Sequence, residues 1–126
     1  MKATELRLGN LIEYKIEDKL DERKEWWEVS KVDFQDLTWL DSNPEDTDFR
    51  PIKLTEEWLL KFGFEDLEDY FIEFFDNGDI RFFICAYMDN PPSVKIKYVH
   101  QLQNLYFALT GEELTQVSEG KNKNFV

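Results

Sequence analysis

The stretch YVHQLQNLYFALTGEEL, residues 98–114, marks the point where a strand-rich sequence becomes helical. Its apolar side chains recur at helical spacing, in Tyr98, Leu102, Leu105, Tyr106 and Leu109. Gly111 follows where a helix would end. The first turns also carry four uncharged polar side chains: His100, Gln101, Gln103 and Asn104. The pattern predicts a helix over residues 98–109 that packs its apolar face on a core and turns this polar strip outward.

The sequence upstream of this helix predicts mainly strands. Residues 70–88, YFIEFFDNGDIRFFICAYM, predict a β-hairpin in which Asn77–Gly78 forms a two-residue type I′ turn. Strand-like composition with partial alternation over residues 11–14 and 26–34 predicts two more strands, and residues 36–41 predict one that pairs back with 26–34. Residues 95–97 predict a short edge strand.

A short helix is expected in the middle of the chain. Thr55 is a good N-cap, Glu56 and Glu57 place negative charge in the first turn, and Gly63 ends the helix. We therefore predict an α+β fold with one antiparallel sheet of about five strands, this short helix, and a C-terminal helix packed on the sheet. An SH3-like meander is one arrangement that the first fifty residues allow. The expected organisation is a single domain over residues 1–115 and a polar, flexible tail over 116–126.

Composition and charge restrict the classes of partner. The chain has 126 residues, 42% of them hydrophobic, and its 27 acidic and 15 basic residues give a formal net charge of −12. Such a chain is repelled by phosphate backbones and anionic lipid, so we expect no direct nucleic-acid or membrane partner and favour a basic protein. Alternatively, the charge serves only solubility. The short apolar runs and the absence of an apolar segment at the N-terminus predict a cytoplasmic protein.

Catalytic signals are weak. His100 is the single histidine and Cys85 the single cysteine, so a serine or cysteine hydrolase mechanism would have to use His100. Cys85 lies within an apolar run and is expected to be a buried structural residue. The carboxylates lack the spacing of metal ligands, and the five glycines form no phosphate-binding loop. We therefore expect no catalytic residue, no metal and no cofactor; a small hydrolase using His100 remains the enzymatic alternative.

Carboxylates gather in two regions that contain no basic residue. Residues 65–79 carry Glu65, Asp66, Glu68, Asp69, Glu73, Asp76 and Asp79, and residues 36–48 carry five more. Alternate side chains of a strand lie about 6.6 Å apart, close to the phosphate spacing along a nucleic-acid strand. Such an edge could occupy a Lys/Arg groove built for DNA or RNA. The alternative is a solvated hairpin whose charges resist edge-to-edge aggregation.

Aromatic residues on both faces of the predicted hairpin suggest a different role. They are Phe71, Phe74, Phe75, Phe82, Phe83 and Tyr87. One face must cover the core, and the other requires a helix or a partner. An accessory domain that assembles through aromatic surfaces, without inhibiting anything, is therefore the second functional hypothesis.

Three blocks of the sequence carry a resemblance to a family. LRLGN (6–10), PIKLTEEWLLKFGF (51–64) and YVHQLQNLYFALTGEEL (98–114) resemble, in this order, small proteins of Bacteroidetes genomes and their phages. The resemblance implies a phage or mobile-element context, in which small acidic proteins bind and inhibit host machinery, but it assigns no role to single residues.

The leading hypothesis is a non-enzymatic acidic protein that inhibits a basic, nucleic-acid-handling host protein, such as an RNA-guided defence effector, as a nucleic-acid mimic. The predicted partner-binding residues are the seven carboxylates of residues 65–79 together with His100, Gln101 and Asn104.

Overall fold

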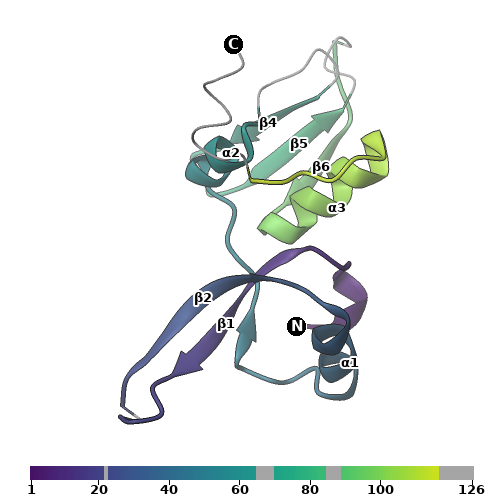
Figure 1. Cartoon of the computed structure of the whole chain (residues 1–126). Helices are drawn as coiled ribbons and strands as arrows, with labels where there is room; N and C mark the ends of the chain where they lie inside the picture. The colour runs from purple at the N-terminus through teal and green to yellow at the C-terminus, as the bar shows by residue number, and fades with distance from the viewer. Residues whose placement is uncertain (22, 65–69, 85–88, 117–126) are drawn as a thin grey trace, which may run out of the picture. The chain divides into compact units, whose positions relative to one another are not determined.

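The computed structural model describes residues 1–21, 23–64, 70–84 and 89–116 (Figure 1). The chain gathers into two compact units, where the sequence predicts a single domain. Residues 1–53 and 98–111 make the first unit, and residues 54–97 and 112–126 make the second. The fold is α+β, but the strands of the described residues form two three-stranded antiparallel sheets. The prediction of one sheet of about five strands is therefore wrong, whereas the class is confirmed.

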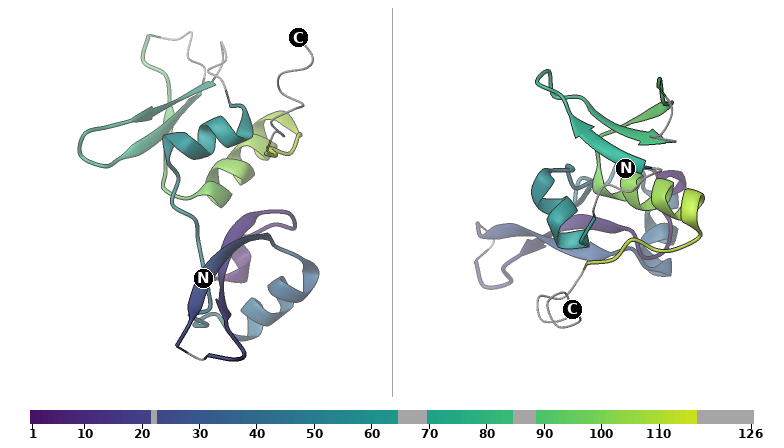
Figure 2. Two further views of the ribbon diagram at one scale, coloured as in Figure 1. Left: turned by 60° about the vertical axis from the view of Figure 1, so that its left-hand side comes forward. Right: turned by 90° about the horizontal axis from the view of Figure 1, so that it is seen from above.

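The first unit combines a three-stranded sheet with three helical segments. Strand β1 (Leu11–Glu17) lies between β2 (Glu25–Lys31) and the short β3 (Phe49–Arg50). Strands β1 and β2 pair along their whole length, from Leu11 opposite Lys31 to Glu17 opposite Glu25, as a long twisted ribbon (Figure 2). The helical segments are η1 (Ala3–Glu5), α1 (Phe34–Ser42) and α3 (Val99–Thr110).

Helix α1 occupies the place where the sequence predicted a strand over residues 36–41. The Asp33 carboxylate accepts from the backbone N of Asp36 at 2.8 Å, and the Asp36 carboxylate accepts from the backbone N of Asp33 at 3.1 Å. This reciprocal capping box satisfies two N–H groups that a helix start leaves unpaired, and so favours a helix here. The SH3-like meander is also wrong, because β3 pairs with β1 and not with β2, so that the strand order is β2-β1-β3.

The core of the first unit explains which face of α1 is left exposed. Leu40 is completely buried and packs in a cluster with Leu6, Ile12 and Val32. Leu37 lies partly buried against the same cluster. Because a helix has only one face toward the core, the side chains opposite Leu37 and Leu40 are left to solvent.

Helix α3 contacts β1, which confirms that the C-terminal helix packs on a sheet. It begins after Tyr98, whose backbone N donates to the Gln101 side chain at 3.0 Å, and ends at Gly111, which has a φ of 76°. Leu102 of the predicted apolar stripe is fully buried. The other members of that stripe, Tyr98, Leu105, Tyr106 and Leu109, are half-buried.

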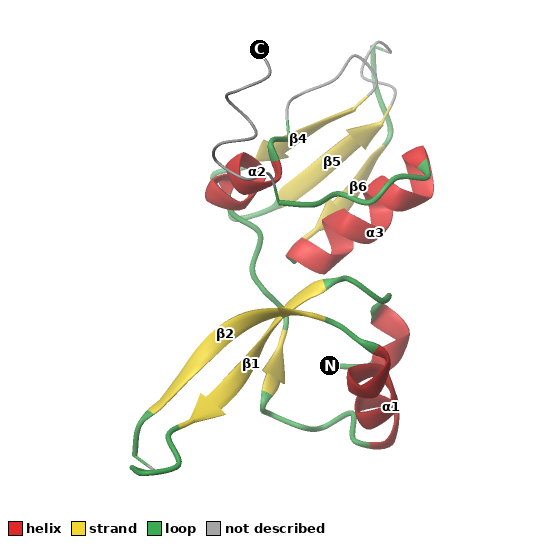
Figure 3. Ribbon diagram, in the orientation of Figure 1, coloured by secondary structure: helices red, strands yellow, loops and turns green. Residues whose placement is uncertain are grey.

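The second unit contains helix α2 (Glu56–Phe62) and a sheet of β4 (Tyr70–Phe74), β5 (Ile80–Ile84) and β6 (Ser93–Ile96), in the order β4-β5-β6 (Figure 3). The prediction for α2 is confirmed, since Thr55 accepts from the backbone N of Trp58 and Gly63 has a φ of 64°. Trp58 and Phe62 of this helix are buried. No helix in the described ranges is long and apolar enough to cross a membrane.

The β4–β5 hairpin is confirmed, but its turn differs from the predicted one. The backbone N of Phe75 donates to Asp79 O at 2.8 Å, and the N of Gly78 donates to Phe75 O at 3.0 Å. These bonds enclose a three-residue loop, with Gly78 at a φ of 93° as its last residue. A left-handed residue after a tight turn is the usual form of a three-residue hairpin, and it uses glycine once instead of an Asn–Gly pair.

The aromatic side chains of the hairpin divide between two environments. Phe82 is completely buried, and the rings of Phe64 and Tyr70 lie against it at centroid distances of 6.3 and 5.8 Å. Phe71 and Phe83 are directly opposite each other and stack at 4.5 Å, half-buried. Cys85, Tyr87 and most of the predicted tail lie outside the described residues, and so do the predictions made for them.

Candidate functional site on helix α1

The structure describes only part of the predicted acidic hairpin surface. Glu65, Asp66, Glu68 and Asp69 lie outside the described residues. The other three carboxylates are described: Glu73, Asp76 and Asp79. Glu73 lies opposite Arg81 across the β4–β5 pair, and the Asp79 carboxylate is 3.1 Å from Lys95 Nζ. Two of the three therefore have a basic neighbour in their own sheet, which reduces the net negative field that they present to a partner.

The predicted outward polar strip of α3 is wrong for two of its members. His100 is 1% exposed and Gln103 is 3% exposed. Gln103 Oε1 accepts from the buried backbone N of Leu11 at 2.8 Å. A side-chain amide here supplies the acceptor that the start of β1 needs, which explains why a polar residue is retained in the interior.

Asn104 is the centre of a second set of hydrogen bonds between α3 and the N-terminal segment. Its Oδ1 accepts from Arg7 Nε at 2.9 Å and from Asn10 Nδ2 at 2.8 Å, and its Nδ2 donates to Glu5 O at 3.1 Å. The Arg7 guanidinium also lies 4.3 Å from the ring centre of Phe107. An amide offers both a donor and an acceptor, which a carboxylate or an ammonium group does not. The polar residues of α3 thus join two of the three blocks that carry the family resemblance.

His100 has an unusual environment for a candidate base. Both ring nitrogens are buried, and neither has a hydrogen-bond partner in the described part of the chain. The ring stacks on Tyr98 at a centroid distance of 5.8 Å. Burial lowers the pKa of His100, and the charge of Glu5 opposes this effect. The imidazole is therefore neutral near pH 7, and no hydrogen bond in the described structure links it to a nucleophile.

Helix α1 presents two large aromatic side chains to solvent. Phe34 is 72% exposed and Trp39 is 52% exposed. With four polar neighbours they line a shallow, mainly apolar depression formed by Phe34, Gln35, Thr38, Trp39, Ser42 and Asn43. We call this depression the α1 groove. Exposed aromatic side chains gathered on one helix face are a common feature of contact surfaces.

A second depression shares Trp39 and is strongly acidic. Its volume is about 510 Å³, and it is lined by Tyr14, Lys15, Gln35, Asp36, Trp39, Asp46, Asp48 and Phe49. We call it the Trp39 pocket. Strand pairing builds one wall, because Tyr14 of β1 lies opposite Phe49 of β3 and the backbone N of Lys15 donates to Asp48 O at 2.8 Å.

Hydrogen bonds fix the carboxylates and the indole of this pocket. Trp39 Nε1 donates to Asp46 Oδ2 at 2.6 Å, and the backbone N of Asp48 donates to Asp46 Oδ1 at 2.8 Å. These two bonds, the backbone one foremost, lower the pKa of Asp46. Partial burial instead raises the pKa of Asp36. Lys15 is the basic lining residue, and its Nζ lies 3.8 Å from Asp48 and 3.9 Å from Glu25.

Sequence reasoning recognised the run of carboxylates over residues 36–48 but not this site. The sequence predicts a strand and a loop for this run, and it gives Trp39 no functional role. The available signal was Asp33-x-x-Asp36 followed by Leu37 and Leu40 at helical spacing, which places Trp39 away from the core. Nothing local in the sequence indicates that Tyr14 and Phe49 complete the pocket.

The α1 surface offers exposed aromatic rings and carboxylates to a partner. No group of three or more His, Cys, Asp or Glu side chains within the described ranges is arranged to hold a metal ion. Comparison with protein-family models, curated proteins and solved structures gave no match. On the α1 surface, aromatic rings and carboxylates together favour a cationic partner.

Proposed function

We propose that the protein is a non-enzymatic binding protein whose acidic surface engages a basic protein. The observation that carries the proposal is the surface of α1 and the loop after it. Residues 33–48 contain six carboxylates and no basic residue: Asp33, Asp36, Asp41, Glu45, Asp46 and Asp48. Four of these residues are exposed, and Asp36 and Asp46 are half-buried. Asp36, Asp46 and Asp48 line the pocket that contains the exposed Trp39.

A nucleic-acid-handling protein is the partner class with the best-matched surface. Such proteins carry Lys and Arg in grooves that neutralise phosphates, and a surface rich in carboxylates competes for the same charges. The net charge of −12 supports long-range attraction to such a groove. The partner we favour is a host protein, of the RNA-guided defence type, which the protein inhibits as a nucleic-acid mimic; the resemblance to Bacteroidetes and phage proteins supports this context by analogy.

The β4–β5 hairpin is the second acidic surface in this proposal. Glu73 and Asp76 are exposed, and both belong to the acidic run over residues 65–79. Because Asp79 is paired with Lys95 and Glu73 faces Arg81, we assign the hairpin a supporting role and the α1 surface the main one. His100 and Asn104 are better explained as structural residues, since one is buried and the other joins α3 to the N-terminal segment.

The test begins with capture of the partner from a host lysate on the immobilised protein, followed by mass spectrometry. The affinity of the recovered partner is then measured between about 50 and 200 mM salt, where we expect a steep decrease. The double charge reversal Asp41→Lys/Glu45→Lys should weaken binding about tenfold or more, because attraction is replaced by repulsion. Glu17→Lys/Asp89→Lys makes the same change in net charge at exposed sites elsewhere and serves as the control. A tight complex that responds neither to salt nor to Asp41→Lys/Glu45→Lys would rule out the proposal.

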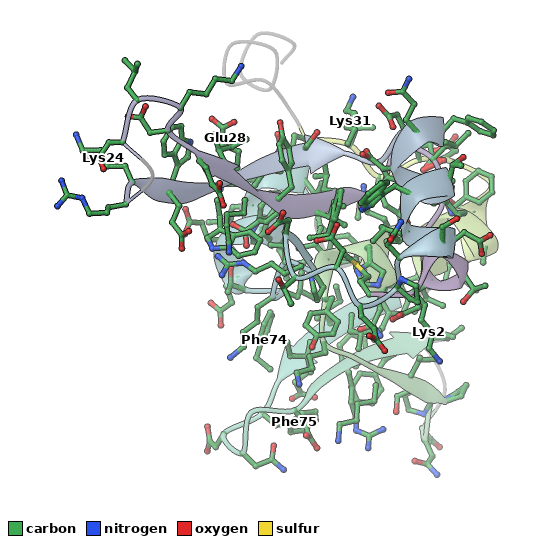
Figure 4. The ribbon with its side chains drawn as sticks, turned by 90° about the horizontal axis from the view of Figure 1, so that it is seen from below. Lys2, Lys24, Glu28, Lys31, Phe74 and Phe75 are labelled. Atoms are coloured by element: carbon green, nitrogen blue, oxygen red, sulfur yellow. The ribbon has the colours of Figure 1, made fainter. Side chains whose placement is uncertain are left out.

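A second candidate function is assembly through an apolar edge. Strand β2 is the outer strand of its sheet, and Trp26 and Val29 on it are 45% and 44% exposed. Charged residues also lie along this strand and at the hairpin tip, among them Lys24, Glu28 and Lys31 (Figure 4), and such charges usually prevent edge pairing. This candidate predicts a molecular mass in solution that rises with protein concentration and is lost in Trp26→Ser/Val29→Ser. A strictly monomeric protein excludes it.

A further inference from the structure

We infer that the Trp39 pocket receives an arginine side chain of the basic partner. The inference rests on the proposed function and specifies the contact that gives it selectivity. Three aromatic side chains line the pocket, Tyr14, Trp39 and Phe49, and three carboxylates lie beside them, Asp36, Asp46 and Asp48. A cation near an aromatic face is attracted by the ring, and adjacent carboxylates accept its N–H groups.

The charge balance of the pocket favours an incoming cation. Lys15 is the single basic lining residue against three carboxylates, and it divides its charge between Asp48 and Glu25. The described hydrogen bonds to Asp36 and Asp46 come from backbone N–H groups and the Trp39 indole. The Trp39–Asp46 bond also holds the indole in place before a partner arrives, which reduces the entropy lost on binding.

The protein already uses this arrangement for its own arginines. Arg50 lies 3.9 Å from the ring centre of Trp27 while its Nε donates to Glu13 at 3.0 Å. Arg7 lies over Phe107 and donates to Asn104. The Trp39 pocket has the same ring and oxygen acceptors, but no arginine is among its lining residues. We favour arginine over lysine because a planar guanidinium stacks on an indole and donates to neighbouring carboxylates at the same time.

The inference can be tested with a short Gly/Arg peptide and the ¹⁵N-labelled full chain. The reporter is the Trp39 indole N–H resonance, which is identified by its loss in Trp39→Phe. We expect a saturable shift of this resonance with the arginine peptide and none with the matched citrulline peptide, which keeps the shape but lacks the charge. The matched lysine peptide should bind about two- to fivefold more weakly, because stacking is lost.

Matched variants locate the binding site on the protein. Asp48→Asn and the isosteric Asp46→Asn should each lower the affinity for the arginine peptide about two- to fivefold, as expected for a partly exposed charge pair. Asp41→Asn removes one charge from α1 outside the pocket lining and should have a smaller effect. Thermal unfolding of each variant checks that the fold is retained, and Asp48→Asn provides an independent result if Asp46→Asn disturbs the loop.

The outcomes separate this inference from the proposed function. The pocket inference is overturned, while charge-based binding stands, if three results occur together. The arginine and lysine peptides bind equally, Asp41→Asn weakens binding as much as Asp48→Asn, and the Trp39 indole resonance does not shift. If no peptide binds although a basic partner is recovered from lysate, the pocket inference is again overturned. If the peptide binds at Trp39 but no salt-dependent basic partner is recovered, the pocket stands and the proposed function fails.

Discussion

Asn104→Ala is expected to destabilise the first unit strongly, although Asn104 is only half-buried. The substitution removes all three hydrogen bonds of the side chain, to Arg7, Asn10 and Glu5. Water can replace the partners of Arg7 and of Glu5 O, so each of these losses costs about 0.5 kcal/mol. Asn10 is 1% exposed, and its amide would be left buried with an unpaired donor, which costs about 1–3 kcal/mol. The total is about 2–4 kcal/mol.

Urea unfolding followed by tryptophan fluorescence measures this loss. Three of the four tryptophans, Trp26, Trp27 and Trp39, belong to the same unit as Asn104, so the signal reports mainly on that unit. With a slope of about 2 kcal/mol per molar urea, the midpoint should fall by about 1–2 M. The control is Asn90→Ala at an exposed position, for which we expect a change within about 0.5 kcal/mol.

A second substitution at the same position tests the geometric reasoning. Asn104→Asp keeps oxygen acceptors for Arg7 and Asn10 but loses the donor to Glu5 O. It should therefore be less destabilising than Asn104→Ala, with a loss of about 1 kcal/mol. If Asn104→Ala unfolds at the same urea concentration as Asn90→Ala, or if Asn104→Asp is the more damaging change, the network does not stabilise the protein in the way described.

Three further predictions concern other elements. Thr55→Ala should lower the unfolding free energy of the second unit by about 1 kcal/mol, because α2 loses its N-cap. Thr55→Ser should retain most of this stability, since the serine hydroxyl can cap the helix in the same way, and equal losses in the two variants would contradict the capping role. Gly78→Ala should cost about 1 kcal/mol or more in urea unfolding, since a φ of 93° is unfavourable for any residue with a Cβ; an unchanged midpoint would refute a strained turn. The lowered pKa of His100 means that the unfolded chain binds the proton more readily, so stability should decrease as pH falls below the unfolded value of about 6.5. His100→Leu should flatten the stability profile between pH 7.5 and 5.5, and an identical profile in both proteins would show that His100 does not contribute.

Much of the local structure can be predicted from the sequence, because its causes are local. The Thr55 cap and the left-handed Gly63 and Gly111 determine where helices begin and end through side-chain chemistry within a few residues. The hairpin around Gly78 follows from two aromatic runs and a turn sequence, although the loop length was predicted one residue too short. The start of α1 also has a local cause, the capping box of Asp33 and Asp36, although the composition of residues 36–41 is typical of a strand.

The candidate site could be predicted only in part. The excess of carboxylates, and with it the preference for a basic partner, is a property of composition and needs no fold. The pocket itself depends on where β1, α1 and β3 meet, and on the Tyr14–Phe49 pairing that the strand register imposes. Such contacts join residues more than thirty positions apart, and periodicity in a single sequence carries no information about them.

The sequence by itself determined the α+β class, the ends of α2 and α3, the hairpin and the acidic character of the surface, since each follows from nearby side chains or from total charge. The tertiary structure alone decided the division of the strands between two sheets, the return of α3 to the first unit, and the inward position of Gln103 and His100. The polar residues of α3 show the physical reason. An uncharged strip on a helix can face solvent or form hydrogen bonds with buried polar groups. In this protein the second case holds, because the fold places Asn10 and Leu11 against α3, where they donate to Asn104 and Gln103.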